Sequence, residues 1–176
     1  MPEAPDLEVI TEVLNRRVAG QTVVEALVVR PLVLRSLAAP VFEADITGRV
    51  LEGFSRRGKF LLARLSGECL LVINPMLTGA LQYCESGERL AKRTFFLLGL
   101  SGGRQLRYLD DRQMGMAYYV APDQLPQVPR LLDQGPDVLA EPLAFGEFCD
   151  RLRRYHGEIK GVLTRGAFVS GSRQAG

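Results

Sequence analysis

The sequence has few of the side chains that hold metals in proteins. It contains one histidine and three cysteines among its 176 residues. Cys69, Cys84 and Cys149 stand far apart and form no Cys-x-x-Cys pair, the spacing that zinc sites use. His156 has no neighbouring groups with which to build a catalytic triad, and we expect it to be solvated. The sequence therefore predicts no metal site and no cofactor in this chain.

Long apolar runs and a strong charge imbalance are missing too. No stretch of about eighteen apolar residues could span a membrane. The first residues, MPEAPDLEVI, carry acids early, whereas a secretory signal begins basic and then turns apolar. We therefore expect a cytoplasmic protein that contacts no membrane. The net charge of +2 is mild for a nucleic-acid-binding protein, so charge alone does not indicate such a partner.

What is present indicates a helix followed by strands. Leu7, Ile10, Leu14 and Val18 fall at helical spacing and predict a helix over residues 3–18. Short apolar and β-branched runs separated by glycine turns predict strands at 22–29, 49–54, 59–65, 68–73, 94–100, 105–109 and 117–120, with 31–40 as a loop. This pattern is typical of a mainly β, α+β fold: an N-terminal helix plus an antiparallel β-sandwich, spanning residues 1–120.

The composition changes after the predicted sandwich. Five prolines fall within residues 121–143, which we interpret as a linker with at most a short helical turn. From Phe145 the pattern is helical again, because Phe148, Leu152 and Tyr155 share a face. A second helix is expected to begin at Ile159 and to include Leu163 and Phe168. We interpret residues 144–176 as the start of a helical domain that is cut short at GSRQAG.

The N-terminus offers a possible nucleophile. Methionine is commonly removed before a small residue, which would leave Pro2 with a free secondary amine. Free α-amino groups have pKa values of about 8, so a useful fraction is neutral and able to form a Schiff base with an electrophilic carbon. Glu3 could then act as a general acid. Taken alone, Met-Pro-Glu is equally typical of an ordinary helix start.

Three other segments could contact DNA. The basic turn at residues 56–59 could place three cations over a phosphate backbone, or could be a solvated hairpin tip. The loop at 74–79 carries apolar residues that could fill the gap left by a flipped base, or could pack into the core. The loop at 110–115 carries an arginine near an apolar residue. These side chains could also fill the gap left by a flipped base, or the loop could be a turn with an ion pair.

In order and spacing, these segments resemble the formamidopyrimidine-DNA glycosylase and endonuclease VIII family of base-excision repair enzymes. MPEAPDLEVI is similar to the family's MPELPEVE-type opening, SRRGKFLLARL to its RRGK strand, and NPMLTGAL to its HLGMTG-type loop. LRYLDDRQMG is similar to its Y-x-DPRRFG segment, and QGPDVL to its LGPDPL linker. IKGVLTRGAFVSG is similar to the IK-x-x-LLDQ-x-x-x-x-G start of its helix–two-turn–helix module.

The resemblance implies roles for individual residues. It makes Pro2 the Schiff-base nucleophile, Glu3 the general acid, and Lys59 a contact to the lesion's backbone that assists catalysis. Leu77 takes the place of an intercalating methionine and Arg112 that of an intercalating arginine. The DNA-binding residues that we expect are Arg57, Asn74, Leu77, Arg112, Met114 and Lys160.

The implied activity is that of a DNA glycosylase with abasic-site (AP) lyase activity on oxidised or ring-opened bases. The implied partner is damaged double-stranded DNA, bound by a monomer. Asn74, Asp111 and Gln113 depart from the family pattern, and the family's C-terminal zinc finger is expected to be absent. Because of these departures, a second interpretation stays open: the chain is a truncated or degenerate, non-catalytic DNA-binding relative of the family. A β-sandwich without any nucleic-acid role is a further alternative.

Overall fold

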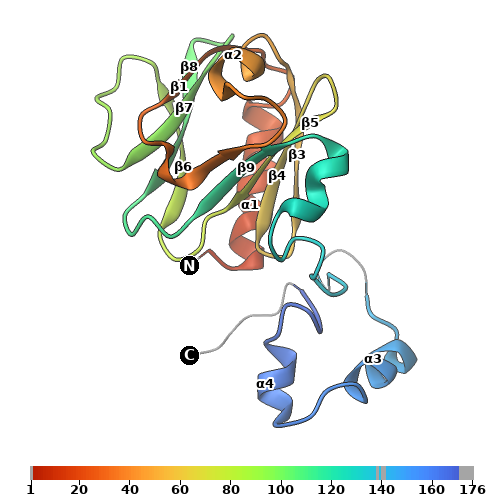
Figure 1. The fold of residues 1–176 in the computed structure, drawn as a ribbon. Helices are drawn as coiled ribbons and strands as arrows, with labels where there is room; N and C mark the ends of the chain where they lie inside the picture. The colour runs from red at the N-terminus through yellow and green to blue at the C-terminus, as the bar shows by residue number, and fades with distance from the viewer. Residues whose placement is uncertain (1, 138, 140–141, 171–176) are drawn as a thin grey trace.

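Two β-sheets face each other in the first two thirds of the chain (Figure 1). The computed structural model describes all residues except 1, 138, 140–141 and 171–176. The four-stranded sheet runs in the order β1 (Val23–Val28), β7 (Thr94–Leu100), β8 (Arg104–Asp110), β6 (Gly79–Glu85). The five-stranded sheet runs in the order β2 (Leu34–Ser36), β9 (Met116–Val120), β5 (Cys69–Asn74), β4 (Phe60–Leu65), β3 (Leu51–Arg57). The predicted β-sandwich is confirmed.

The space between the sheets is filled by apolar and aromatic side chains. Phe95, Tyr108 and Tyr119 are completely buried there, and the rings of Phe96 and Tyr108 stack with centroids 5.4 Å apart. Full burial of one large apolar side chain stabilises a fold by about 1.5–3 kcal/mol. This interior therefore supplies most of the stability of the sandwich.

The helix α1 (Ala4–Arg17) covers the free edge of the five-stranded sheet. The edge strand β3 has unpaired backbone groups on its outer side, and Asn15 satisfies two of them. The Asn15 Nδ2 amide donates to the Phe54 carbonyl at 2.8 Å, and the Phe54 N–H donates to Asn15 Oδ1 at 2.7 Å. These bonds fix the helix against the sheet and so fix where the N-terminal residues lie.

Several elements differ from the sequence-based prediction. The segment 31–40 is not only loop, because it contains a 3-10 turn η1 (Pro31–Val33) and the three-residue strand β2. Strand β2 pairs with β9 in parallel, whereas every other pair is antiparallel. The short helix α2 (Phe42–Ile46) and the strand β6 were not predicted. Strand β6, GALQYCE, begins with glycine and does not alternate strictly between apolar and polar residues, so its pattern is too weak to indicate a strand.

Residues after the sandwich form two different packing units. The 3-10 turn η2 (Pro122–Gln127) leads into Val128 and Leu131, which pack with Phe60 and Val72 on the outer face of the five-stranded sheet. The helices α3 (Phe145–Leu152) and α4 (Ile159–Leu163) pack around a small separate core. Helix α4 ends before Phe168, so the expectation that this residue belongs to the helix is wrong. Phe168 is instead the centre of that core.

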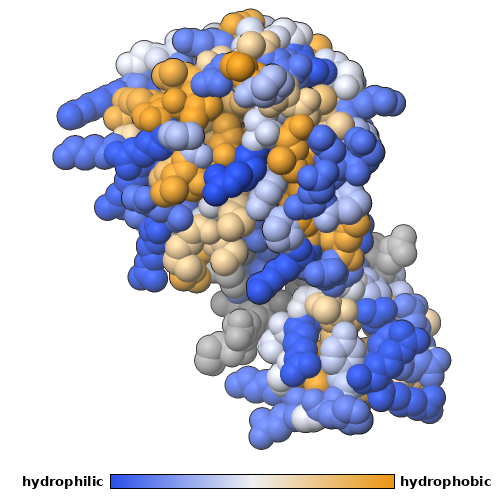
Figure 2. Space-filling model, in the orientation of Figure 1, coloured by the Kyte–Doolittle hydropathy of each residue, from blue (hydrophilic) through white to orange (hydrophobic). Residues whose placement is uncertain are grey.

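The two units present different surfaces. Figure 2 shows hydrophobic surface gathered on the β-sandwich, whereas the C-terminal segment shows mainly hydrophilic surface on this face. Within the described part of the chain, no helix is both long and apolar enough to cross a lipid bilayer.

Candidate active site

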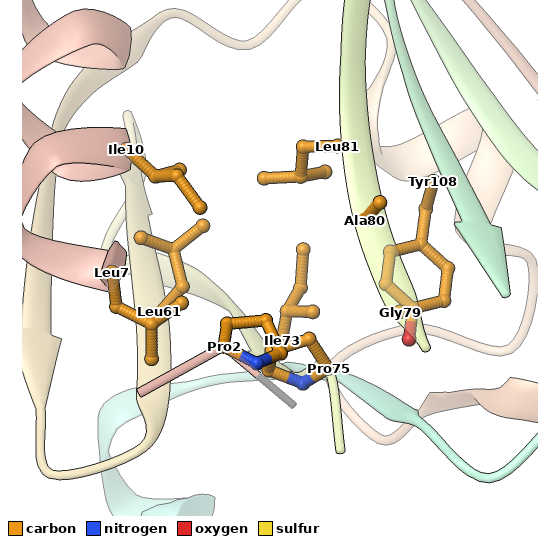
Figure 3. Close-up of a pocket in the computed structure, with 10 residues that line it drawn as sticks. All are labelled: Pro2, Leu7, Ile10, Leu61, Ile73, Pro75, Gly79, Ala80, Leu81 and Tyr108. Carbon is orange, nitrogen blue, oxygen red and sulfur yellow. The ribbon is translucent and has the colours of Figure 1, made fainter. Parts of the chain in front are cut away.

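Pro2 lies at one end of the sandwich, just before α1, where the two sheets open (Figure 3). It borders a cavity of about 20 Å³. The other lining residues are almost all apolar and come from α1 and both sheets: Leu7, Ile10, Leu61, Ile73, Pro75, Gly79, Ala80, Leu81 and Tyr108. A space of this size holds about one water molecule, so a nucleobase would have to bind outside it.

Glu3 and Lys59 meet beside Pro2, although they come from distant parts of the sequence. The Lys59 ammonium lies 3.6 Å from Glu3 Oε2, with 36% of the lysine side chain and 20% of the glutamate side chain exposed. The same Glu3 oxygen is buried and accepts no hydrogen bond from any described residue. A carboxyl oxygen in that condition is available for a hydrogen bond to a bound substrate.

The local structure explains why these side chains converge. Lys59 is the second residue of the two-residue turn Gly58-Lys59 that joins β3 to β4, and Gly58 has φ +57°. Tight hairpin turns of this kind need positive φ, which glycine adopts without strain. On the other side, the Glu3 N–H donates to the Asp6 carboxylate at 2.8 Å, which fixes the first turn of α1.

Arg56 does not belong to a solvated basic turn, and here the sequence-based interpretation is wrong. Arg56 and Arg57 lie within β3, and only 3% of the Arg56 side chain is exposed. Its guanidinium binds both oxygens of Asp137, at 2.5 and 3.1 Å, and donates to Glu8 Oε2 at 2.7 Å and to the Gly58 carbonyl at 3.0 Å. Arg56 is therefore not available to a phosphate.

The Arg56–Asp137 pair joins the sandwich to the segment beyond it. Burial raises the pKa of Asp137, but hydrogen bonds from Arg56 and from the Leu139 N–H outweigh this effect, so its pKa lies below the ordinary value. Burial opposes the charge of Arg56 in the same way, yet its bonds to Asp137 and Glu8 leave its pKa raised. We call Arg56, Asp137 and Glu8 the clasp. Neither Arg56 nor Asp137 was predicted to pair, because they stand 81 positions apart.

Three of the other predicted DNA contacts lie on regular elements of the structure. Arg57 and Lys160 are exposed, on β3 and α4 respectively, and so could reach a phosphate. Asn74 ends β5, and its side-chain oxygen accepts a hydrogen bond from the Met76 N–H at 3.2 Å. Met76 has φ +49°, which is unusual for a side chain other than glycine. The HLGMTG-type loop that NPMLTG resembles has glycine at this position, which fits the backbone conformation.

Leu77, Arg112 and Met114 lie on two loops that leave the same end of the β6–β8 pair. Gly79 at the start of β6 faces Asp110 at the end of β8, so residues 75–78 and 111–115 are neighbours in space. Arg112 is exposed, and Leu77 and Met114 are 40% and 43% exposed. Leu77 therefore does not pack into the core, so the alternative expectation is wrong for this residue, whereas Met76 beside it is half-buried.

No group of histidine, cysteine or acidic side chains that could hold a metal ion occurs among the described residues. The expectation that the chain holds no metal or cofactor stays a prediction. The predicted end of the chain within GSRQAG and the predicted removal of Met1 fall on residues outside the described ones.

Comparison with known proteins identifies the family. The sequence model of the formamidopyrimidine-DNA glycosylase N-terminal domain matches residues 1–117. Formamidopyrimidine-DNA glycosylases of Moorella thermoacetica, Desulforamulus reducens and Enterococcus faecalis are 36%, 33% and 31% identical to this chain over 97% of its length. The chain spans 61–62% of the length of these relatives.

Solved structures give the same answer for the fold. The Lactococcus lactis formamidopyrimidine-DNA glycosylase, crystallised non-covalently bound to DNA with an abasic site, matches with a TM-score of 0.85 and 24% identity. The match covers 97% of this chain and 65% of that one. A second complex of the same enzyme with abasic-site DNA matches with a TM-score of 0.86 and 23% identity. With a family model that covers two thirds of it, the chain belongs to the formamidopyrimidine-DNA glycosylase family.

Proposed function

We propose that this chain carries the catalytic part of a base-excision DNA glycosylase with AP lyase activity, with Pro2 as its nucleophile. The observation that carries the proposal is the convergence of Pro2, Glu3 and Lys59 at the open end of the sandwich. The family supports it, since the matching relatives are formamidopyrimidine-DNA glycosylases and one was crystallised with abasic-site DNA.

The chemistry requires a free amine on Pro2, so Met1 must be removed first. The amine attacks C1′ of the damaged nucleotide, the C1′–N bond to the base breaks, and the proton that the amine nitrogen loses passes to the leaving base. The C1′–O4′ bond then opens, O4′ takes up a proton, and an iminium forms between Pro2 and C1′. The iminium acidifies the proton on C2′, and its loss expels the 3′ phosphate by β-elimination. Water then hydrolyses the iminium and releases the enzyme.

Glu3 and Lys59 have complementary tasks in this scheme. Glu3 would donate a proton to the sugar ring oxygen as the ring opens, a step that general acids accelerate by about 10²–10⁴-fold. Lys59 would hold that carboxyl in place and contact the phosphate beside the lesion. The cavity next to Pro2 is too small for the base, so the flipped base would lie on the outer side of Pro2.

Leu77, Arg112 and Met114 would fill the space that the flipped nucleotide leaves in the duplex. Their exposure on two adjacent loops supports this role. Exposed Arg57 and Lys160 would bind phosphates, which contribute most of the affinity of such proteins for DNA. The substrates that we propose are oxidised or ring-opened bases in double-stranded DNA, bound by one copy of the chain.

The test is borohydride trapping on a duplex with one abasic site. Borohydride reduces the iminium to a stable amine, so an active protein gains the mass of the DNA strand, and digestion locates the attachment. We expect the adduct on residue 2, with Glu3→Gln and Lys59→Met forming it at least about tenfold more slowly. An alternative function, DNA binding without catalysis, is favoured by Asp111, which pairs with Arg93 beside the exposed loops and so reduces positive charge there. Binding of abasic DNA without any adduct, in protein shown to lack Met1, would establish that alternative.

A further inference from the structure

The two exposed loops are connected to each other by one hydroxyl group. Thr78 Oγ donates to Asp110 Oδ1 at 2.5 Å and accepts the Arg112 N–H at 2.9 Å. Thr78 belongs to the loop between β5 and β6, whereas Arg112 belongs to the loop between β8 and β9. A single side chain therefore ties the loop that carries Leu77 to the loop that carries Arg112.

Asp110 completes the connection from inside the protein. Asp110 is 1% exposed, and a carboxyl group buried to this extent must be satisfied by hydrogen-bond donors. Besides the Thr78 hydroxyl it accepts the Gly115 N–H at 2.6 Å and the Arg112 N–H at 3.2 Å. These bonds fix both ends of the short segment that contains Met114. Hydrogen bonds to a charged group are roughly twice as strong as those between neutral groups.

Below this connection, Tyr108 sets the spacing of the two loops. Its ring is completely buried, and its hydroxyl lies where a Cβ atom would fall on Gly79 or on Gly115. Only glycine fits at these two positions, the first at the start of β6 and the second at the end of the loop between β8 and β9. The two loops are therefore packed closely as well as hydrogen-bonded.

We propose that Thr78 and Asp110 are positioning residues that hold Leu77, Arg112 and Met114 as one preformed wedge for entering duplex DNA. The proposal rests on the proposed function. Opening a base step costs free energy, and ordering loose side chains at the same moment would add a conformational-entropy cost for each one. Two loops that hydrogen bonds already hold in place avoid this entropy cost. These hydrogen bonds matter for binding duplex DNA, which must be opened, and much less for binding a single strand.

The experiment compares two isosteric substitutions of the same kind. Thr78→Val removes the connecting hydroxyl but keeps the shape of the side chain. Thr94→Val is the matched control, because the Thr94 hydroxyl is completely buried and makes no hydrogen bond to any described residue. Thr78→Ser restores the hydroxyl. Melting temperature is measured for each variant of the 176-residue chain, so that loss of folding is recognised.

The readout is fluorescence of 2-aminopurine placed opposite a tetrahydrofuran abasic analogue, together with affinity for the same strand in duplex and single-stranded form. The probe reports whether the side chains enter the stack, and the analogue cannot be cleaved. We expect Thr78→Val to lower the ratio of duplex to single-strand affinity about tenfold and to lose most of the fluorescence change. Thr78→Ser and Thr94→Val should match the unmodified chain.

The outcomes separate the two proposals. If the unmodified chain neither binds abasic DNA nor forms an adduct with it, the proposed function is wrong. If the unmodified chain gives the fluorescence change and Thr78→Val gives it equally, the wedge does not depend on Thr78 and the inference is overturned. An equal loss of affinity for duplex and single strand, at unchanged melting temperature, would also overturn it, because a wedge acts only on a duplex.

Discussion

The β-sandwich and the C-terminal segment are held together in different ways. In the sandwich, side chains from two facing sheets form a continuous interior around Phe95, Tyr108 and Tyr119. In the segment from Leu143 to Ser170, the described core has three buried residues, Val162, Phe168 and Val169, with Phe148 and Tyr155 set edge-on against the Phe168 ring. A core of this size contributes little stability alone, so the segment depends on its connections to the sandwich.

Those connections are few and polar. The Gly135 N–H donates to the Gly166 carbonyl at 2.7 Å, and the Ser170 N–H donates to the Pro136 carbonyl at 2.9 Å. The segment is thus hydrogen-bonded to residues 135–136. The next residue, Asp137, forms the ion pair with Arg56 of the sandwich. The sandwich is thus stabilised by apolar burial, whereas the position of the segment is set by the clasp.

The largest expected effect comes from removing one aromatic ring in each region. Phe95→Ala should lower the free energy of unfolding of the sandwich by about 3–5 kcal/mol, and Phe168→Ala should destabilise the C-terminal segment by a similar amount. Phe95→Ala should lower protection from hydrogen exchange in every strand. Phe168→Ala should remove protection from residues 145–170 and leave that of β7 and β8 unchanged. Loss of protection across both regions in Phe168→Ala would show that they unfold as one unit.

A smaller effect is expected from the clasp, and adjacent arginines provide the comparison. Arg56→Met should destabilise the hydrogen bonds that the Gly135 and Ser170 amides donate by about 3 kcal/mol, because it leaves the Asp137 carboxylate without the Arg56 guanidinium. Arg57→Met, one residue on and exposed, should change stability by less than about 0.5 kcal/mol. It should instead weaken the salt dependence of DNA binding: the slope of log affinity against log salt concentration should become smaller by about one. Reversed behaviour of the two variants would contradict the assignment of Arg56.

Acid should loosen the clasp by a still smaller amount. The pKa of Asp137 is lower in the folded chain than its ordinary value of 3.8. Such a carboxyl stabilises the fold above its unfolded pKa, and this contribution is lost as the pH falls through the lower, folded value. Protection of the Ser170 amide should therefore stay constant down to about pH 5 and fall below about pH 4. Asp137→Asn should weaken the protection of the Ser170 amide at neutral pH and abolish its further loss below about pH 4. If that loss at low pH is unchanged in Asp137→Asn, another carboxyl group causes it.

The smallest expected effect lies in the interior of the sandwich. The Tyr108 hydroxyl is buried without a hydrogen bond to any described residue, and burial raises its pKa well above the ordinary value. Tyr108→Phe removes a polar group that gains nothing from the fold, so it should leave the melting temperature unchanged or raise it slightly. Calorimetry checks this directly, and a loss of more than about 1 kcal/mol would mean that the hydroxyl has a partner.

Much of the fold could be predicted from the sequence, because its strongest patterns are local. The helix predicted at 3–18 is observed at Ala4–Arg17, and the strands predicted at 94–100 and 105–109 are β7 and β8. Two strands were missed: β2 has only three residues, and β6 does not alternate strictly between apolar and polar residues. The parallel pairing of β2 depends on contacts that no local pattern records.

The candidate site was predictable to a similar extent. Pro2, Glu3 and Lys59 were recognised through short motifs, and the structure places them together. Arg56 was misread because a run of basic residues looks the same whether it faces solvent or a distant carboxylate. Thr78 and Asp110 were missed because a hydroxyl and a carboxylate 32 positions apart reveal their bond only in the folded chain.

The central claim is that the amine of Pro2 performs the chemistry, and one comparison tests it without changing any side chain. The chain is prepared with Pro2 as its first residue and, separately, with one glycine ahead of it, so that Pro2 becomes an amide. Both are trapped with borohydride on abasic duplex DNA, and their affinity for the uncleavable analogue is measured. We predict a covalent adduct on residue 2 in the first protein, at least about a thousandfold less in the second, and equal affinity. An adduct that persists in the second protein, or that maps to Lys59, would contradict the account.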